Sequence, residues 1–194
     1  MRKSWIFVPM MILLLSGCSL GSGSRETDRM ALDIQNEYRD STECAARASI
    51  VSDYGQRIHS YEMEVAVSGE RTTLTITAPE EVAGISAVAE GVDTFLEYGE
   101  LVLETGPLDG EGLTPVSAVP VLLEAARNGM ICCCTMEEKE DLLRVEYGDP
   151  QREPGQGREV TIWFSPSDHS IRQGEIALDG VRVISCTFED FTMR

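Results

Sequence analysis

Positive charge is scarce in this chain of 194 residues, which contains 16 lysines and arginines against 33 aspartates and glutamates. Residues 1–17 hold two of the basic residues and none of the acidic ones, so the remainder has 14 basic against 33 acidic residues, a formal charge of −19. This balance argues against nucleic acid, whose phosphates attract lysine and arginine, and against a basic lipid-binding face. The charge indicates solubility, with a binding role as the alternative.

Hydrophobic runs long enough to cross a bilayer are also missing, because a membrane-spanning helix takes about 20 residues. An apolar run extends from Trp5 to Leu15 and follows the basic pair Arg2 and Lys3. Charged and apolar regions of this length are typical of a secretory signal peptide. We therefore expect residues 1–17 to be removed on export.

The sequence Leu15-Ser16-Gly17-Cys18 follows this run and resembles the lipobox of bacterial lipoproteins, in which the cysteine thiol is acylated and the leader is cut just before it. The resemblance implies that Cys18 carries fatty acyl chains of the palmitate type. Two or three such chains give stable anchoring, so the protein would sit on the extracytoplasmic face of the cell membrane. An ordinary secretory signal with a chance cysteine is the alternative.

The residues after the leader divide into a tether and one domain. Residues 18–28 are small and polar after the cysteine and predict a flexible tether, leaving 29–194 for the domain. Apolar residues then recur at helical spacings and predict a helix over 28–53; they are Met30, Ile34, Tyr38, Ala45 and Ala48.

Alternation of apolar and polar residues with a period of two dominates the rest of the chain. It predicts strands at 61–67, 72–77, 84–89, 93–98, 101–105, 131–136, 141–147, 160–164, 171–178 and 181–188. A short helix is expected over 117–128, with Ser117 as its cap and Gly129 just past its end. These elements predict an α+β domain: a curved antiparallel sheet, an open half-barrel, whose concave face is covered by the N-terminal helix and the short helical insert.

This order of parts resembles the LolA/LolB superfamily of lipoprotein carriers and related lipoproteins, including germination-type lipoproteins of clostridia. The features that match are the lipobox, the N-terminal helix, the first strand Tyr61–Val67, the insert near 117–128 and the C-terminal hairpin at Asp179-Gly180. The resemblance implies a half-barrel with a helical lid and a hydrophobic cavity for acyl chains. The lipobox departs from a freely shuttling carrier, so an anchored domain would take cargo locally or bind a partner.

Eleven apolar residues are expected on the concave face as ligand-binding candidates, with plain core as the alternative. They are Met63, Val65, Val67, Leu74, Ile76, Leu101, Leu103, Ile162, Phe164, Ile176 and Leu178. Carriers of this type also keep a basic residue near the cavity, for which Arg71 and Arg144 are candidates.

Two functions follow from these expectations. The first is a non-enzymatic, membrane-anchored lipoprotein that binds a lipid or another apolar ligand in its concave face. The second is an interaction scaffold or activator for a cell-envelope or spore-cortex enzyme. No cofactor is expected for either function.

Five cysteines remain besides Cys18: Cys44, Cys132, Cys133, Cys134 and Cys186. Their spacing lacks the paired C-x-x-C motifs of a metal site. Buried apolar thiols and one disulfide to Cys44 or Cys186 both remain open.

Catalytic signals are weak. The chain has two histidines: His59 precedes the first expected strand, and His169 follows Asp168 in an expected turn, without a G-x-S-x-G motif. The glutamate pairs at 80–81 and 137–138 are expected to be solvated. Trp163 is expected either buried against the N-terminal helix or exposed on the convex face, where an aromatic can anchor a partner.

Overall fold

The computed structural model describes residues 22–194 except 91, 92, 109, 150 and 154. The expected signal peptide and Cys18 lie outside the described residues. The elements are, in order, α1 (Ser22–Asp40), β1 (Glu43–Asp53), β2 (Ile58–Ser68), β3 (Arg71–Ala78), a 3-10 turn η1 (Glu80–Val82), β4 (Ser86–Glu90), β5 (Asp93–Tyr98), β6 (Leu101–Glu104), α2 (Pro115–Asn128), β7 (Ile131–Glu137), β8 (Leu142–Tyr147), β9 (Arg158–Phe164), β10 (Ile171–Leu178) and β11 (Val181–Met193).

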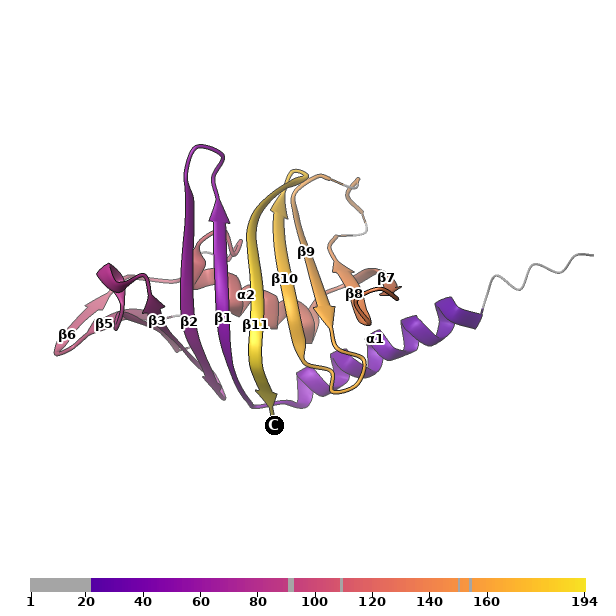
Figure 1. The fold of residues 1–194 in the computed structure, drawn as a ribbon, viewed down its shortest axis with the longest axis horizontal. Helices are drawn as coiled ribbons and strands as arrows, with labels where there is room; N and C mark the ends of the chain where they lie inside the picture. Colours follow the sequence, from indigo (N-terminus) through magenta and orange to yellow (C-terminus); the bar gives the residue numbers. More distant parts are fainter. Residues whose placement is uncertain (1–21, 91–92, 109, 150, 154) are drawn as a thin grey trace, which may run out of the picture.

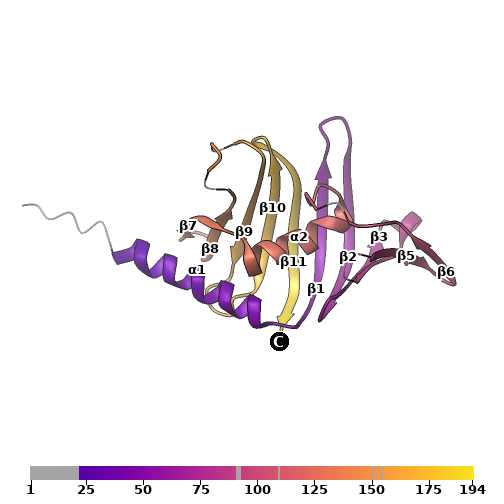
Figure 2. The ribbon, with the colours of Figure 1, turned by 180° about the vertical axis from the view of Figure 1, so that it is seen from behind.

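One antiparallel sheet of eleven strands organises the described chain, in the order β6-β5-β4-β3-β2-β1-β11-β10-β9-β8-β7. The sheet is curved and does not close, and α2 crosses its concave side in front of β10, β11 and β1 (Figures 1 and 2). The α+β open half-barrel expected from the sequence is therefore confirmed. No helix among the described residues combines the length and the apolar character needed to cross a membrane.

The N-terminal segment differs from the expectation of one helix over 28–53. Helix α1 begins at Ser22 and ends at Asp40, so residues 22–28 of the expected tether are helical, while residues 43–53 form β1. Along β1 the buried side chains alternate, among them Ala46, Ala48 and Ile50. Alanine is common in helices, but pairing on both sides with β2 and β11 outweighs that local preference.

The other ten strands each match an expected strand, with small shifts at the ends. The position of helix α2 was predicted correctly, but its cap was not, because the N-cap is Thr114 and not Ser117. The Ser117 amide donates to Thr114 Oγ1 over 3.3 Å, and the Thr114 amide donates to Ser117 Oγ over 3.1 Å. This reciprocal capping box satisfies amides that lack an intrahelical partner.

Helix α2 packs closely on the sheet because a glycine lies beneath it. A Cβ added at Gly174 of β10 would lie 2.6 Å from Leu122 Cδ1, and Leu122 is fully buried. Glycine at this position lets the helix approach the strand.

Helix α1 packs beside α2 and against the β7–β8 end of the sheet. Its C-terminal half is attached by side chains: Gln35 Nε2 donates to the Gly129 carbonyl over 2.8 Å, and Arg127 Nε donates to the Tyr38 carbonyl over 3.2 Å. Ala31, Ile34 and Tyr38 are buried. The end of α1 nearer the N-terminus projects beyond the sheet (Figure 1).

Candidate binding surface on the concave face

The eleven residues expected on the concave face fall into three groups by exposure. Seven are buried in the hydrophobic core: Met63, Val65, Val67, Leu74, Ile162, Phe164 and Ile176. Ile76 and Leu178 are half-buried, whereas Leu101 and Leu103 are 68% and 57% exposed. The structure therefore separates the set into seven core residues, two half-buried residues and two exposed leucines.

The central part of the concave face is filled by the protein's own side chains. The seven buried residues share one core with the buried face of α2, which comprises Ala118, Val119, Leu122, Leu123, Ala125 and Ala126. Two cavities lie elsewhere in the protein. One, of about 440 Å³, lies beside the C-terminal end of α2, and the other, of about 540 Å³, lies beside β8, β9 and the segment that joins them. None of the eleven residues lines either cavity.

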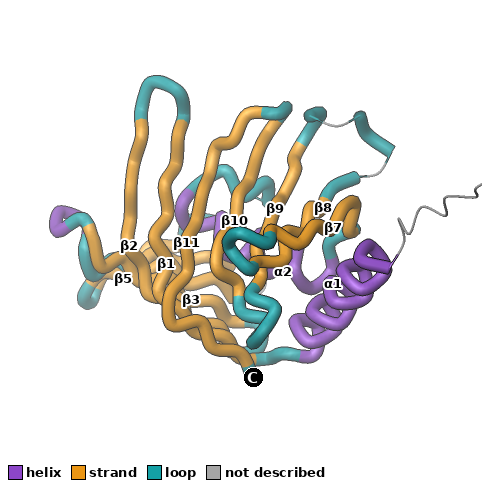
Figure 3. The backbone as a smooth tube through the Cα atoms, turned by 45° about the vertical axis from the view of Figure 1, so that its right-hand side comes forward, coloured by secondary structure: helices purple, strands orange, loops and turns teal. Residues whose placement is uncertain are grey.

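The apolar surface continues beyond α2 along the strand register. Val65 of β2 lies opposite Leu74 of β3, which lies opposite Ala87 of β4, and the row continues through Leu96 of β5 to Leu103 of β6. The first three are buried and Leu96 is half-buried, so exposure rises along this row towards β6. Figure 3 shows that the strands beyond β2 curve away from the central strands of the sheet.

This uncovered end of the concave face forms what we call the apolar strip. It comprises Leu96, Tyr98, Leu101 and Leu103, since Tyr98 pairs with Leu101 on the same face as Leu103. Tyr98 is 59% exposed. The strand register places Leu101 and Leu103 on the concave face, as expected from the sequence. The sequence analysis did not include Leu96 and Tyr98 in this set. The unbroken run Leu101-Val102-Leu103, where an exposed strand would alternate, was the available signal.

The backbone next to the strip is also open, because β6 is the last strand of the described sheet. The Thr105 amide donates to the Thr94 carbonyl over 2.9 Å. The amide and carbonyl groups of successive residues point to opposite edges of an antiparallel strand, so those of Leu101 and Leu103, like the Thr105 amide, point to β5. Val102 and Glu104 direct theirs away from the sheet.

The surroundings of the strip are strongly acidic. Between Arg71 and Arg127 the sequence contains no lysine or arginine and ten acidic residues. Glu97, Glu100 and Glu104 belong to β5, β6 and the turn between them. An apolar surface with a rim of one charge favours a partner of the opposite charge.

The two arginines considered as cavity residues are engaged elsewhere. Arg71 Nη1 lies 3.4 Å from Glu90 Oε2 at the surface. Arg144 forms ion pairs with Glu137 and Glu146 and lies over the ring of Trp163, 5.7 Å from its centroid. Trp163 alternates with the core residues of β9, so it lies on the convex face, where it is 9% exposed. Trp163 is therefore buried, as the first alternative expected, but on the convex face and beneath Arg144 rather than against the N-terminal helix.

The five cysteines that the structure describes are all free thiols. Cys44 and Cys186 are buried, and burial raises the pKa of Cys44 to about 11 and that of Cys186 to about 12. Cys132 and Cys133 are exposed on β7. The structure thus favours the thiol alternative over the disulfide, although only two of these five thiols are buried, Cys134 being half-buried.

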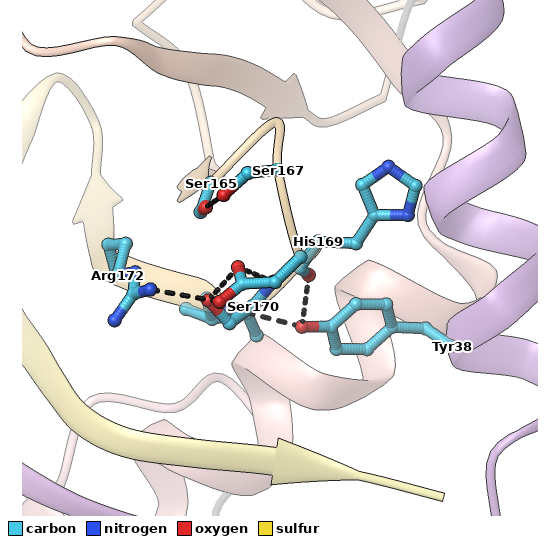
Figure 4. Close-up of polar contacts among 8 residues, drawn as sticks. Tyr38, Ser165, Ser167, His169, Ser170 and Arg172 are labelled. Atoms are coloured by element: carbon cyan, nitrogen blue, oxygen red, sulfur yellow. Dashed lines mark hydrogen bonds and ion pairs between the residues drawn. The ribbon is translucent and has the colours of Figure 1, made fainter.

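The turn that contains Asp168 and His169 joins β9 to β10 and fixes α1 (Figure 4). Asp168 Oδ1 accepts from Ser170 Oγ over 2.6 Å, while His169 Nδ1 lies 2.7 Å from Glu37 Oε2. Asp168 and His169 thus contact different partners. Tyr38 completes the link, because its hydroxyl donates to the His169 carbonyl over 2.9 Å and accepts from the Ile171 amide over 3.1 Å.

The remaining candidates for catalysis are dispersed among the described residues. His59 lies within β2, not before it, and is exposed. Glu80 and Glu81 are exposed in η1, and Glu138 is exposed after β7. The described residues contain no group of three histidine, cysteine, aspartate or glutamate side chains that could hold a metal ion.

Comparison with known proteins shows similarity in fold. No family model matches the chain, and no curated protein matches it. An uncharacterised conserved protein from Thermus thermophilus is 7% identical with a TM-score of 0.50, covering 86% of this chain and 87% of that one. A LolA superfamily protein from Nitrosomonas europaea is 12% identical with a TM-score of 0.43, covering 87% and 93%.

A structure of the CwlD amidase from Clostridioides difficile in complex with the GerS lipoprotein also matches, at 14% identity and a TM-score of 0.46, covering 86% of this chain and 95% of that one. At such identities the likeness concerns the fold alone. The structures similar to this chain thus include a LolA superfamily protein, and the chain itself forms an α+β open half-barrel.

Proposed function

We propose that this protein is a non-enzymatic interaction protein, anchored to the extracytoplasmic face of the cell membrane through lipidated Cys18, which binds a partner protein through the apolar strip. The observation that carries the proposal is the exposure of Tyr98, Leu101 and Leu103, each more than half accessible, side by side on one face. Contiguous exposed apolar residues with a polar rim are characteristic of interaction sites.

Lipid binding in the concave face, the other function expected from the sequence, stays a prediction with less support. The seven buried candidates already share one core with the buried face of α2, so an acyl chain would have to displace core side chains. Native mass spectrometry of the purified protein tests it directly. Lipid bound at one copy per chain, lost on replacing Leu74 or Phe164, would favour the carrier function over ours.

Site-specific photocrosslinking in the native membrane tests the proposed surface. A benzophenone amino acid replaces Leu103, and a matched control carries it at Val181, which is apolar and 64% exposed on the β10–β11 hairpin. We expect one defined protein adduct from position 103 and none of that mass from position 181. Equal adducts at both positions, or none at 103, would contradict the proposal. Mass spectrometry of the adduct also tests whether the partner is an envelope or spore-cortex enzyme.

The anchor is tested separately. We expect the wild-type protein to incorporate labelled fatty acid and to partition into membranes, and a Cys18→Ala variant to do neither. Unchanged partitioning of this variant, together with an unlabelled wild type, would remove the anchor from the proposal.

A further inference from the structure

We infer that the partner binds by adding a positively charged, extended segment as a new strand beside β6, with its apolar side chains on the apolar strip. The inference rests on the proposed function and specifies the chemistry of the partner. Three observations support it: the open backbone edge of β6, the distribution of apolar and acidic residues on its two faces, and the absence of lysine and arginine from the sequence between Arg71 and Arg127.

The backbone of β6 provides the first contact. Val102 and Glu104 direct their amide and carbonyl groups outward from the last strand of the described sheet. An extended peptide satisfies such groups by continuing the hydrogen-bond ladder, as in strand-addition complexes. An acyl chain offers neither donors nor acceptors, so this edge favours a polypeptide over a lipid tail.

The two faces of β6 set the side-chain pattern of the partner. Leu101 and Leu103 lie on the concave face, whereas Val102 and Glu104 lie on the other face by alternation. Glu97 pairs with Val102 and shares that second face. A strand next to β6 would therefore place apolar residues beside the leucines and basic residues beside Glu97 and Glu104, because cross-strand neighbours of opposite charge attract.

Charge also excludes the simplest alternative occupant, a second copy of this chain. The whole chain has a formal charge of −17, and no lysine or arginine occurs between Arg71 and Arg127. Two β6 strands paired edge to edge would bring Glu100 and Glu104 of each copy together, and like charges on neighbouring strands repel. An anionic lipid headgroup meets the same repulsion.

A synthetic peptide gives a direct test with the full chain in detergent micelles. The probe is a fluorescent eight-residue peptide of alternating valine and lysine, and its binding is followed by fluorescence anisotropy. Matched probes replace lysine by glutamate, or carry N-methyl groups on alternate amides, which block the ladder. We expect the valine–lysine peptide to bind at least about tenfold more tightly than either control. For the N-methylated peptide, this factor of about ten is the scale of one or two lost hydrogen bonds.

Two variants separate strand addition from general attraction between a basic peptide and an acidic protein. Val102→Pro removes an outward amide that the sheet does not use, and proline is tolerated on edge strands; Val102→Ala keeps the amide. We expect about tenfold weaker binding for the proline variant, and less than about twofold for the alanine variant, with unchanged melting temperatures for both. Glu97→Gln combined with Glu104→Gln should weaken binding and reduce its salt dependence.

Equal binding to Val102→Pro and Val102→Ala would overturn the inference, as would equal binding of the lysine and glutamate peptides. Concentration-dependent dimers that Val102→Pro abolishes would show that a second copy occupies the edge, and would also overturn it. A Leu103 photoadduct that forms equally in Val102→Pro would overturn strand addition while leaving the proposed function intact. Absence of any Leu103 adduct would remove both.

Discussion

At the scale of a single residue, the hydroxyl of Tyr38 links α1 to the sheet. It bonds the part-buried His169 carbonyl and the buried Ile171 amide. We expect Tyr38→Phe to lower the free energy of unfolding by about 1–3 kcal/mol, because the buried Ile171 amide loses its acceptor. Urea denaturation measures this change.

Tyr147 supplies the matched control for this prediction. It is buried like Tyr38, but its hydroxyl has no hydrogen-bond partner among the described residues. The same substitution, Tyr147→Phe, should therefore be neutral or stabilising. Equal destabilisation by the two variants would show that loss of the hydroxyl itself, and not its bonds, determines the effect.

Asp168 makes stability depend on pH in a defined direction. Hydrogen bonds from Ser170 and Ser165 lower the pKa of Asp168 from 3.8 to about 2. A folded-state pKa below the unfolded value stabilises the protein above about pH 3.8, and this contribution is lost as the pH falls through about 2. Because the side chain is 53% exposed, we expect Asp168→Asn to cost about 1 kcal/mol or less at neutral pH.

Thermal melts across the acid range test this prediction. The difference between wild type and Asp168→Asn should shrink steadily between about pH 4 and pH 2. An exposed aspartate of α1 provides the control, since Asp33→Asn should leave the melting temperature nearly unchanged throughout. A gap between wild type and Asp168→Asn that grows on acidification would contradict the assignment.

At the scale of elements, the contact of α2 with β10 depends on Gly174. We expect Gly174→Ala to destabilise the protein by about 1–3 kcal/mol, because the new methyl group would overlap Leu122. In a double-mutant cycle, Leu122→Ala should offset part of that cost. Gly148→Ala is the control, since a Cβ at Gly148 meets Cys132 Sγ at an ordinary 3.6 Å. Additive effects of Gly174→Ala and Leu122→Ala on the free energy of unfolding would contradict the contact between Gly174 and Leu122.

Elements were predictable wherever a local pattern and the packing agreed. The alternation in β2 and β10 identified these strands, since each has one face in the core. The pattern failed at β1, where Ala45 and Ala48 fit a helix and a strand equally well and only pairing with β2 and β11 decides. For Leu101 and Leu103 the pattern predicted the face, but whether a helix covers that face depends on where α2 begins.

At the scale of the whole molecule, the N-terminal helix would determine how the domain is presented in the proposed anchored state. The sequence predicted a flexible tether over residues 18–28, but residues 22–28 of it belong to α1. We expect replacement of the exposed residues Arg25, Glu26 and Asp28 by glycine and serine, with Thr27 kept, to reduce the Leu103 photoadduct in membranes, because glycine and serine favour the helix poorly. An undiminished adduct would show that the helix has no role in presentation.

The early start of α1, four positions after Cys18, has a geometric consequence for the proposed anchored state. A helix of 19 residues is stiff and about 28 Å long, and its far half is fixed to the domain. The distance between the bilayer and β6 would then vary over a limited range only. A partner whose binding segment lies at any other distance from the lipid surface would not reach it, so membrane geometry itself would contribute to selectivity.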